Sequence, residues 1–279
     1  MAKKSELLVA DIVNRFLTSM RVGAAKTTWQ WYEGFLRPFA RNLGRVRANE
    51  FTPSQVRRWI AIKYGAHSPS TQHAAARAIV RAFNWSVSER LLSQSPLTGF
   101  RKPAPSRREF IPSARQYAAC VKVASGPVRD IIKFLWHSGA RPQELRMIQG
   151  VWIVDRKIIV PQLSSKGKRQ RRVIYLDPLA AAVAGRLARE HATGPIFRTK
   201  TGRPLKKDGL SKSIRLIGRA AGVPGLCPYA FRHAFITRLL EKGVDVATVA
   251  ALAGNSPRMV LEVYSHVAQN DNRLLRQLG

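Results

Sequence analysis

Four prolines between residues 96 and 112 divide the chain more sharply than any other sequence feature. They stand at positions 96, 103, 105 and 112, among the basic residues Arg101, Lys102, Arg107 and Arg108. Proline lacks a backbone N–H and keeps the residue before it extended, so neither a helix nor a central strand continues through this segment. The sequence therefore predicts two domains, residues 1–100 and 111–279, joined by a basic, proline-rich linker over 101–110.

Hydrophobic spacing predicts a mainly helical chain. Before the linker, apolar residues recur at helical spacing in four segments, 5–20, 26–41, 53–63 and 70–91, and Thr52-Pro53 and Ser68-Pro69 are typical helix starts. After it, helices are expected at 113–124, 127–138, 178–191, 206–221, 229–242, 245–253 and 257–264, with a short tail helix at 269–277. The β-branched runs Val151–Val154, Lys157–Val160 and Arg171–Leu176 predict one small antiparallel sheet.

The charge of the chain limits what it can bind. Lys and Arg number 48 against 16 Asp and Glu, which gives a formal net charge of +32, and basic residues are in excess on both sides of the linker. A compact protein tolerates such self-repulsion best with a polyanionic partner, so nucleic acid is the first expectation. No uncharged apolar stretch approaches the roughly 18 residues of a membrane span, so we expect a soluble cytoplasmic protein. No metal or cofactor motif is present, and none is predicted.

Two basic residues have local settings suited to phosphate. Arg141 follows the Ser138-Gly139-Ala140 turn and precedes Pro142, which places it at a predicted helix N-terminus, where anions are favoured. A surface ion pair with Glu144 is the plain alternative. Lys166 lies in the turn between two predicted strands. Lysine at the tip of such a hairpin can reach into a groove of the ligand, and the plain alternative is a basic loop that only increases solubility.

The segment Pro228–Phe235 completes a pattern. It reads Pro-Tyr-Ala-Phe-Arg-His-Ala-Phe and is followed by Gly254-Asn255 and, nine residues after Asn255, by Tyr264. With Arg141 and Lys166, these stretches resemble the tyrosine recombinase/integrase family. Its motif is Arg with Glu or Asp three residues later, Lys on a β-hairpin, H-x-x-R-H on a helix, G-H at a helix end and a Tyr nine residues beyond that His. The resemblance covers residues from about 110 to 267.

The resemblance implies both fold and activity. The first part would be a helical, SAM-like core-binding domain and the second an α+β catalytic domain, which together perform site-specific DNA recombination by integration, excision or resolution. Arg141 and Arg232 would hold the oxygens of the scissile phosphate, and Tyr264 would attack it to form a 3′-phosphotyrosyl intermediate. Lys166 would protonate the leaving oxygen, and neither metal nor ATP is needed.

Four further residues would support this chemistry. Glu144 would orient Arg141, and His233 would hold the Arg232 helix in position, although a plain core histidine is equally consistent with the sequence. Two positions depart from the family pattern, because Tyr229 and Asn255 stand where the motif has histidines. Either can hydrogen-bond a phosphate oxygen, but neither matches imidazole as a proton acceptor at neutral pH.

The departures keep alternative functions open. A catalytically impaired relative would bind DNA without cutting it, and so would a regulator that uses residues 246–261 as a helix-turn-helix. A type IB topoisomerase uses similar chemistry, but the chain has no long coiled linker. For the recombinase, the resemblance implies a homotetramer on double-stranded DNA, located at the nucleoid when bound. Accessory DNA-bending or directionality proteins are further candidate partners.

Overall fold

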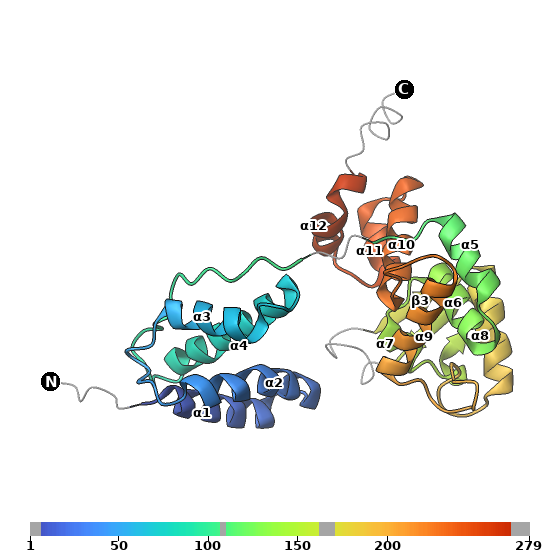
Figure 1. Ribbon diagram of the computed structural model, residues 1–279. Helices are drawn as coiled ribbons and strands as arrows, with labels where there is room; N and C mark the ends of the chain where they lie inside the picture. The colour runs from blue at the N-terminus through green and yellow to red at the C-terminus, as the bar shows by residue number, and fades with distance from the viewer. Residues whose placement is uncertain (1–6, 107–109, 162–170, 269–279) are drawn as a thin grey trace. The chain divides into compact units, whose positions relative to one another are not determined.

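The computed structural model describes residues 7–106, 110–161 and 171–268. The chain forms two compact units, Met1–Arg108 and Glu109–Gly279 (Figure 1). Residues 101–106 have no regular secondary structure. Part of this stretch is hydrogen-bonded to a helix of the first unit: Ser70 Oγ donates to Ser106 O at 2.9 Å, and His73 Nδ1 lies 2.7 Å from Pro103 O. Lys166 and the predicted tail helix lie outside the described residues.

The first unit consists of α1 (Val9–Gly23), α2 (Lys26–Leu43), α3 (Pro53–Tyr64) and α4 (Pro69–Ser88). Figure 1 shows α1 and α2 side by side, with α4 packed against both. Fully buried phenylalanines fill the core, and the rings of Phe51 and Phe83 stack with centroids 5.1 Å apart. The predicted starts of α3 and α4 are confirmed, because the side chains of Thr52 and Ser68 each accept a backbone N–H of the first turn.

The first predicted helix is displaced. It was expected over 5–20 but begins at Val9, because Leu8 forms a β-bridge with Arg47 and donates its N–H to Asp11 Oδ2 at 2.9 Å. The Asp11 carboxylate, at the third helical position, thus caps the N-terminus of the helix. At the other end the helix continues to Gly23, beyond the predicted residue 20.

The second unit is mainly helical with one small sheet, as predicted. Its helices are α5 (Ala114–Val123), α6 (Gly126–Ser138), α7 (Pro142–Leu145), α8 (Pro178–Glu190), α9 (Lys207–Ala220), α10 (Pro228–Glu241), α11 (Val246–Ala253) and α12 (Pro257–Ala268). The strands β1 (Ile153–Val154), β2 (Lys157–Val160) and β3 (Arg172–Tyr175) are antiparallel in the order β1-β2-β3, with Lys157 opposite both Val154 and Tyr175. The first strand is shorter than predicted, because Gly150–Trp152 forms a 3₁₀ turn closed by Trp152 N–H to Gln149 O at 3.1 Å.

Helix α6 is at the centre of the second unit and packs against α5, α8, α9 and α10 (Figure 1). It is apolar on most of its circumference and buries Ile131, Ile132 and Phe134, as expected for a helix surrounded by others. Helix α10 contributes to this core through Phe231 and to a second apolar cluster with α11 and α12 through Ile236. Its side chains are therefore held on both sides. No helix among the described residues is long and apolar enough to cross a bilayer.

Candidate active site

Arg141 is presented by a sharp turn after α6. Gly139 ends that helix at φ +60°, where a Cβ would lie 2.3 Å from the Phe235 ring, so only glycine fits. Glu144 Oε2 accepts the backbone N–H of Arg141 at 2.8 Å, and Oε1 accepts from Arg141 Nη1 at 2.8 Å. Helix α7 has four residues, and the Arg141 N–H at its start already donates to Glu144. Of the anion-binding site predicted at this helix terminus, only the Arg141 guanidinium therefore remains as a binding group.

Arg232 lies on α10 and is 5% exposed. Its Nη1 donates to Gly139 O at 2.8 Å and its Nη2 to Asn255 Oδ1 at 2.8 Å. Burial, together with repulsion from the neighbouring Arg141, lowers the pKa of Arg232 to about 10. The side chain therefore stays charged at neutral pH in an environment that disfavours that charge.

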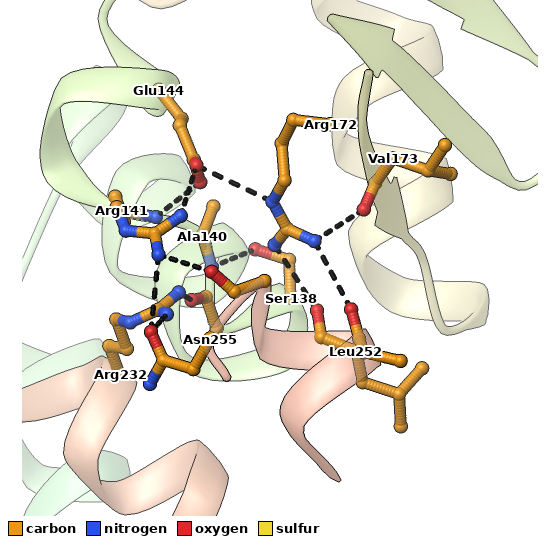
Figure 2. A network of polar contacts seen from close by, with 12 residues as sticks. Ser138, Ala140, Arg141, Glu144, Arg172, Val173, Arg232, Leu252 and Asn255 are labelled. Atoms are coloured by element: carbon orange, nitrogen blue, oxygen red, sulfur yellow. Dashed lines mark hydrogen bonds and ion pairs between the residues drawn. The ribbon is translucent and has the colours of Figure 1, made fainter. Parts of the chain in front are cut away.

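Asn255 joins the two arginines. It follows Gly254, which ends α11 in the left-handed conformation at φ +65°. Its Oδ1 accepts from Arg232 Nη2 and also from Arg141 Nη2 at 3.1 Å, while Arg141 Nη2 donates in addition to the Gly254 carbonyl (Figure 2). Two guanidiniums from distant parts of the chain thus converge on one neutral oxygen.

A third arginine, Arg172, was not singled out from the sequence. It begins β3, is 10% exposed in its side chain, and its Nε lies 3.4 Å from Glu144 Oε1. Its other nitrogens donate to Val173 O and to the last carbonyls of α11, Ala251 O at 3.4 Å and Leu252 O at 3.1 Å (Figure 2). Arg172 therefore ties the sheet to both Glu144 and α11, and burial lowers its pKa. Strand alternation could have indicated it, because Arg172 lies on the same face as the buried Ile174.

Tyr264 is 3% exposed on α12, and its Oη lies 2.5 Å from Nδ1 of His233 on α10. Burial raises the pKa of Tyr264 to about 12, while the positive charge of nearby Arg232 acts in the opposite direction. His233 was expected to hold the Arg232 helix in position. The structure places it in direct contact with the candidate nucleophile.

The remaining candidate residues from the sequence are not part of this hydrogen-bond network in the described residues. Tyr229 is 49% exposed and its hydroxyl makes no hydrogen bond to the described residues, although it lies one turn before Arg232 on α10. Lys166 is outside the described residues, so its position stays a prediction. In the described ranges, no three His, Cys, Asp or Glu side chains gather as a metal site would require. Cys120 is buried and Cys227 is partly buried.

Buried and partly buried arginines converge beside a buried tyrosine, within a helical unit that carries a small sheet. This arrangement has the groups that phosphate binding and nucleophilic attack require. Residues 114–271 match the Phage integrase family, and the chain belongs to it. The match covers more than half of the chain, including the candidate residues Arg141, Arg232, Asn255 and Tyr264.

Two relatives with similar sequences are tyrosine recombinases. Tyrosine recombinase XerD of Staphylococcus haemolyticus is 31% identical over 155 residues, which are 52% of this chain and 52% of the relative. In this alignment the chain spans about half the length of the relative. Tyrosine recombinase XerC of Mycobacterium tuberculosis is 29% identical over 284 residues, 93% of this chain and 94% of the relative.

Solved structures share the fold. The Tn1549 transposon integrase in complex with transposon right end DNA has a TM-score of 0.80 at 16% identity and covers 97% of this chain and 98% of its own. A lambda integrase dimer bound to a COC′ core site has a TM-score of 0.77 at 15% identity, over 94% and 95% of the two chains. The predicted fold class, an N-terminal helical region followed by an integrase catalytic domain, is thus confirmed.

Proposed function

We propose that this chain is an active site-specific DNA recombinase that cuts and rejoins strands through a 3′-phosphotyrosyl intermediate. The observation that carries the proposal is the convergence of Arg141 and Arg232 on Asn255 Oδ1, with Tyr264 near Arg232. A phosphodiester gains negative charge on its non-bridging oxygens during attack, and two fixed guanidiniums stabilise that charge. Loss of one such donor costs about 10²–10³-fold in rate.

Each remaining residue has a defined role in the proposed reaction. Tyr264 Oη attacks phosphorus, the bond to the 5′-oxygen breaks, and Lys166 protonates that oxygen. The tyrosyl ester conserves the energy of the phosphodiester, so a 5′-hydroxyl can reverse the step and rejoin a strand. Because Asn255 Oδ1 already accepts from two arginines, its Nδ2 is the group that would donate to the phosphate, and Tyr229 would add a second neutral donor.

We further infer that the partner is double-stranded DNA and that the active form is a homotetramer. The net charge of +32 supports a polyanionic partner. Among structures with the same fold, one is a lambda integrase tetramer bound to a Holliday junction, with a TM-score of 0.73. The place of action would be the cytoplasm, at the nucleoid.

The test is a covalent-adduct assay on a nicked duplex that carries a site selected by the protein from a random DNA library. Wild type should leave a denaturation-resistant adduct that peptide mapping locates at Tyr264, and Tyr264→Phe should bind DNA without forming it. Tyr175→Phe is the matched control, because Tyr175 is 44% exposed on β3. An adduct formed by Tyr264→Phe would transfer the role to another residue, and Tyr229→Phe would then be examined.

The second candidate function is a catalytically impaired DNA-binding relative. It is favoured by Tyr229 and Asn255, which replace the two motif histidines. Stable binding by wild type without any adduct, on every selected site, would establish it. The helix-turn-helix alternative is less compatible with the geometry, because the turn after α11 supplies Gly254 and Asn255 to the arginine pair.

A further inference from the structure

The contact between Tyr264 and His233 joins the nucleophile to a titratable group that the proposed reaction does not yet use. Tyr264 Oη and His233 Nδ1 are 2.5 Å apart, with ring centroids at 5.7 Å and an interplanar angle of 43°. The backbone of α12 leaves helical geometry at Tyr264, with φ −120° and ψ 18°. The hydrogen bond therefore joins α10 to the point where α12 is kinked.

The pKa shifts of the two side chains keep both of them neutral at neutral pH. Burial raises the pKa of Tyr264 to about 12, so the side chain is a phenol at neutral pH and must lose a proton to attack phosphorus. Burial and the positive charge of Arg232 lower the pKa of His233, so its ring is neutral. In the tautomer with the ring proton on Nε2, the unprotonated Nδ1 accepts and the phenol donates, and this is the tautomer that the proposal requires.

We propose that His233 is the general base that takes the proton of Tyr264 during strand cleavage. This inference rests on the proposed function and assigns the proton acceptor within it. As Oη attacks, the O–P bond forms, the Oη–H bond breaks and an N–H bond forms at Nδ1. The P–O5′ bond breaks, and the 5′-oxygen takes its proton from the general acid. In rejoining, the cationic His233 returns the proton to Tyr264, so protons and charge balance over the cycle.

The titratable and charged groups near His233 support its assignment as the proton acceptor. Tyr229 and Asn255, the residues at the motif histidine positions, are a weak acid and a non-titrating amide. Of the helices packed against α10, α11 has no ionisable side chain. On α12, Arg258 and Glu262 pair with each other, and Tyr264 contacts His233. On α6 and α9 the groups with described bonds pair elsewhere: Arg129 with Ala124, Asp130 with Arg186, His137 with Asp177 and Arg215 with Ser211. Arg232 is the charge that acts on His233.

The proposal predicts a pH dependence with a definite sign. Protonation of His233 removes the acceptor, so the cleavage rate should fall as pH drops through its pKa, which lies below the usual 6.5. General bases contribute about 10²–10⁴-fold in rate, so the loss should reach that order in variants without one. Asparagine places Oδ1 near the position of Nδ1, where it can accept the hydrogen bond but cannot take the proton.

The experiment is single-turnover cleavage of the nicked duplex from pH 5 to 9.5 by wild type, His233→Asn and His233→Ala. His233→Asn should bind DNA as wild type does, cleave about 10²–10⁴-fold more slowly at pH 7, and lose the acidic limb of the profile. His191→Asn, which removes a histidine at the end of α8, is the matched control and should keep both rate and profile. A substrate with a 5′-bridging sulfur, whose leaving group needs no acid, should rescue Lys166→Ala but not His233→Asn.

Several outcomes would overturn the proposal. Wild-type rate and an unchanged acidic limb in His233→Asn would show a positioning role alone. Faster cleavage by His233→Ala would show that the contact restrains the tyrosine. A wild-type profile that is flat from pH 5 to 7 overturns it without any variant, so a failure of the variants to fold leaves the test intact. Failure of the proposed function is recognised separately, because wild type would then form no adduct at Tyr264.

Discussion

Replacement of Arg172 by methionine should destabilise the catalytic unit strongly, although the residue lies outside every motif. The change removes four contacts: one with Glu144 Oε1 and three with the carbonyls of Val173, Ala251 and Leu252. Each is worth about 0.5–1.5 kcal/mol net, and a cation at a partly buried helix C-terminus adds up to about 2 kcal/mol. The buried charge no longer needs desolvation, which offsets part of the loss. We expect a net loss of about 2–4 kcal/mol.

The loss should be concentrated at the end of α11. There the N–H groups of Gly254 and Asn255 donate to Ala251 O at 3.1 Å and Ala250 O at 2.8 Å. Without the guanidinium, this turn should fray, so hydrogen exchange measured by mass spectrometry should accelerate in the peptide that spans α11. Urea denaturation, followed by exchange of catalytic-unit peptides, gives the global free energy without contributions from the first unit.

Arg156→Met is the matched control for this prediction. Arg156 is exposed in the turn between β1 and β2, and its Nε makes one hydrogen bond, to Leu176 O at 3.1 Å. Its loss should cost about 0.5–1.5 kcal/mol and leave exchange in α11 unchanged. If Arg172→Met lies within 1 kcal/mol of this control (roughly a fivefold difference in equilibrium constant) and α11 exchange is unaltered, the assigned bridging role is wrong.

Three further predictions concern the site and its partner. Asn255→Ala should raise the cleavage barrier by about 1–3 kcal/mol, because the phosphate loses a donor, while Asn255→His should be tolerated; equal single-turnover rates for alanine and wild type would contradict this. Gly254→Ala should cost at least about 1 kcal/mol in thermal unfolding, since φ is +65° and the new Cβ would lie 2.6 Å from Arg172 Cζ; an unchanged melting temperature would refute the strain. The logarithm of DNA affinity should fall with that of salt with a slope steeper than about −3, and a shallower slope would argue against multiple phosphate contacts.

Element types were predictable because local chemistry marks them. The strand Lys157–Val160 coincides with its prediction, and α3 starts at Thr52-Pro53 as expected. Errors arise where a tertiary contact overrides the local pattern. Leu8 fits a helix by hydrophobicity but bridges to Arg47, and Val151 is β-branched but lies, 77% exposed, in a 3₁₀ turn.

In the candidate site, too, local sequence predicts some features and tertiary contacts determine the others. The order and spacing of Arg141, Arg232 and Asn255 single out residues that the structure brings together. Spacing alone does not reveal how they meet, because the contacts join α10, the end of α11 and the turn after α6. The roles of Arg172 and His233 depend entirely on such contacts. His233 lies next to Arg232, which has the stronger sequence signal, and Arg172 follows other basic residues in the sequence. Only burial and distance distinguish these two side chains.

The electrostatics of the arginine network support the proposal that this site binds a phosphate. Two of the three guanidiniums, those of Arg141 and Arg172, contact one carboxylate, Glu144, and the Asn255 oxygen that joins Arg141 to Arg232 is neutral (Figure 2). The fall in the pKa of Arg232 from 12.5 to about 10 corresponds to roughly 3 kcal/mol of disfavoured charge at any pH where the group is protonated. An incoming phosphate supplies the missing negative charge, and its attraction grows as charge accumulates on the oxygens during attack. In the proposed reaction, the interaction of the phosphate with Arg232 would therefore be strongest in the transition state, and an interaction stronger there than in the ground state raises the rate.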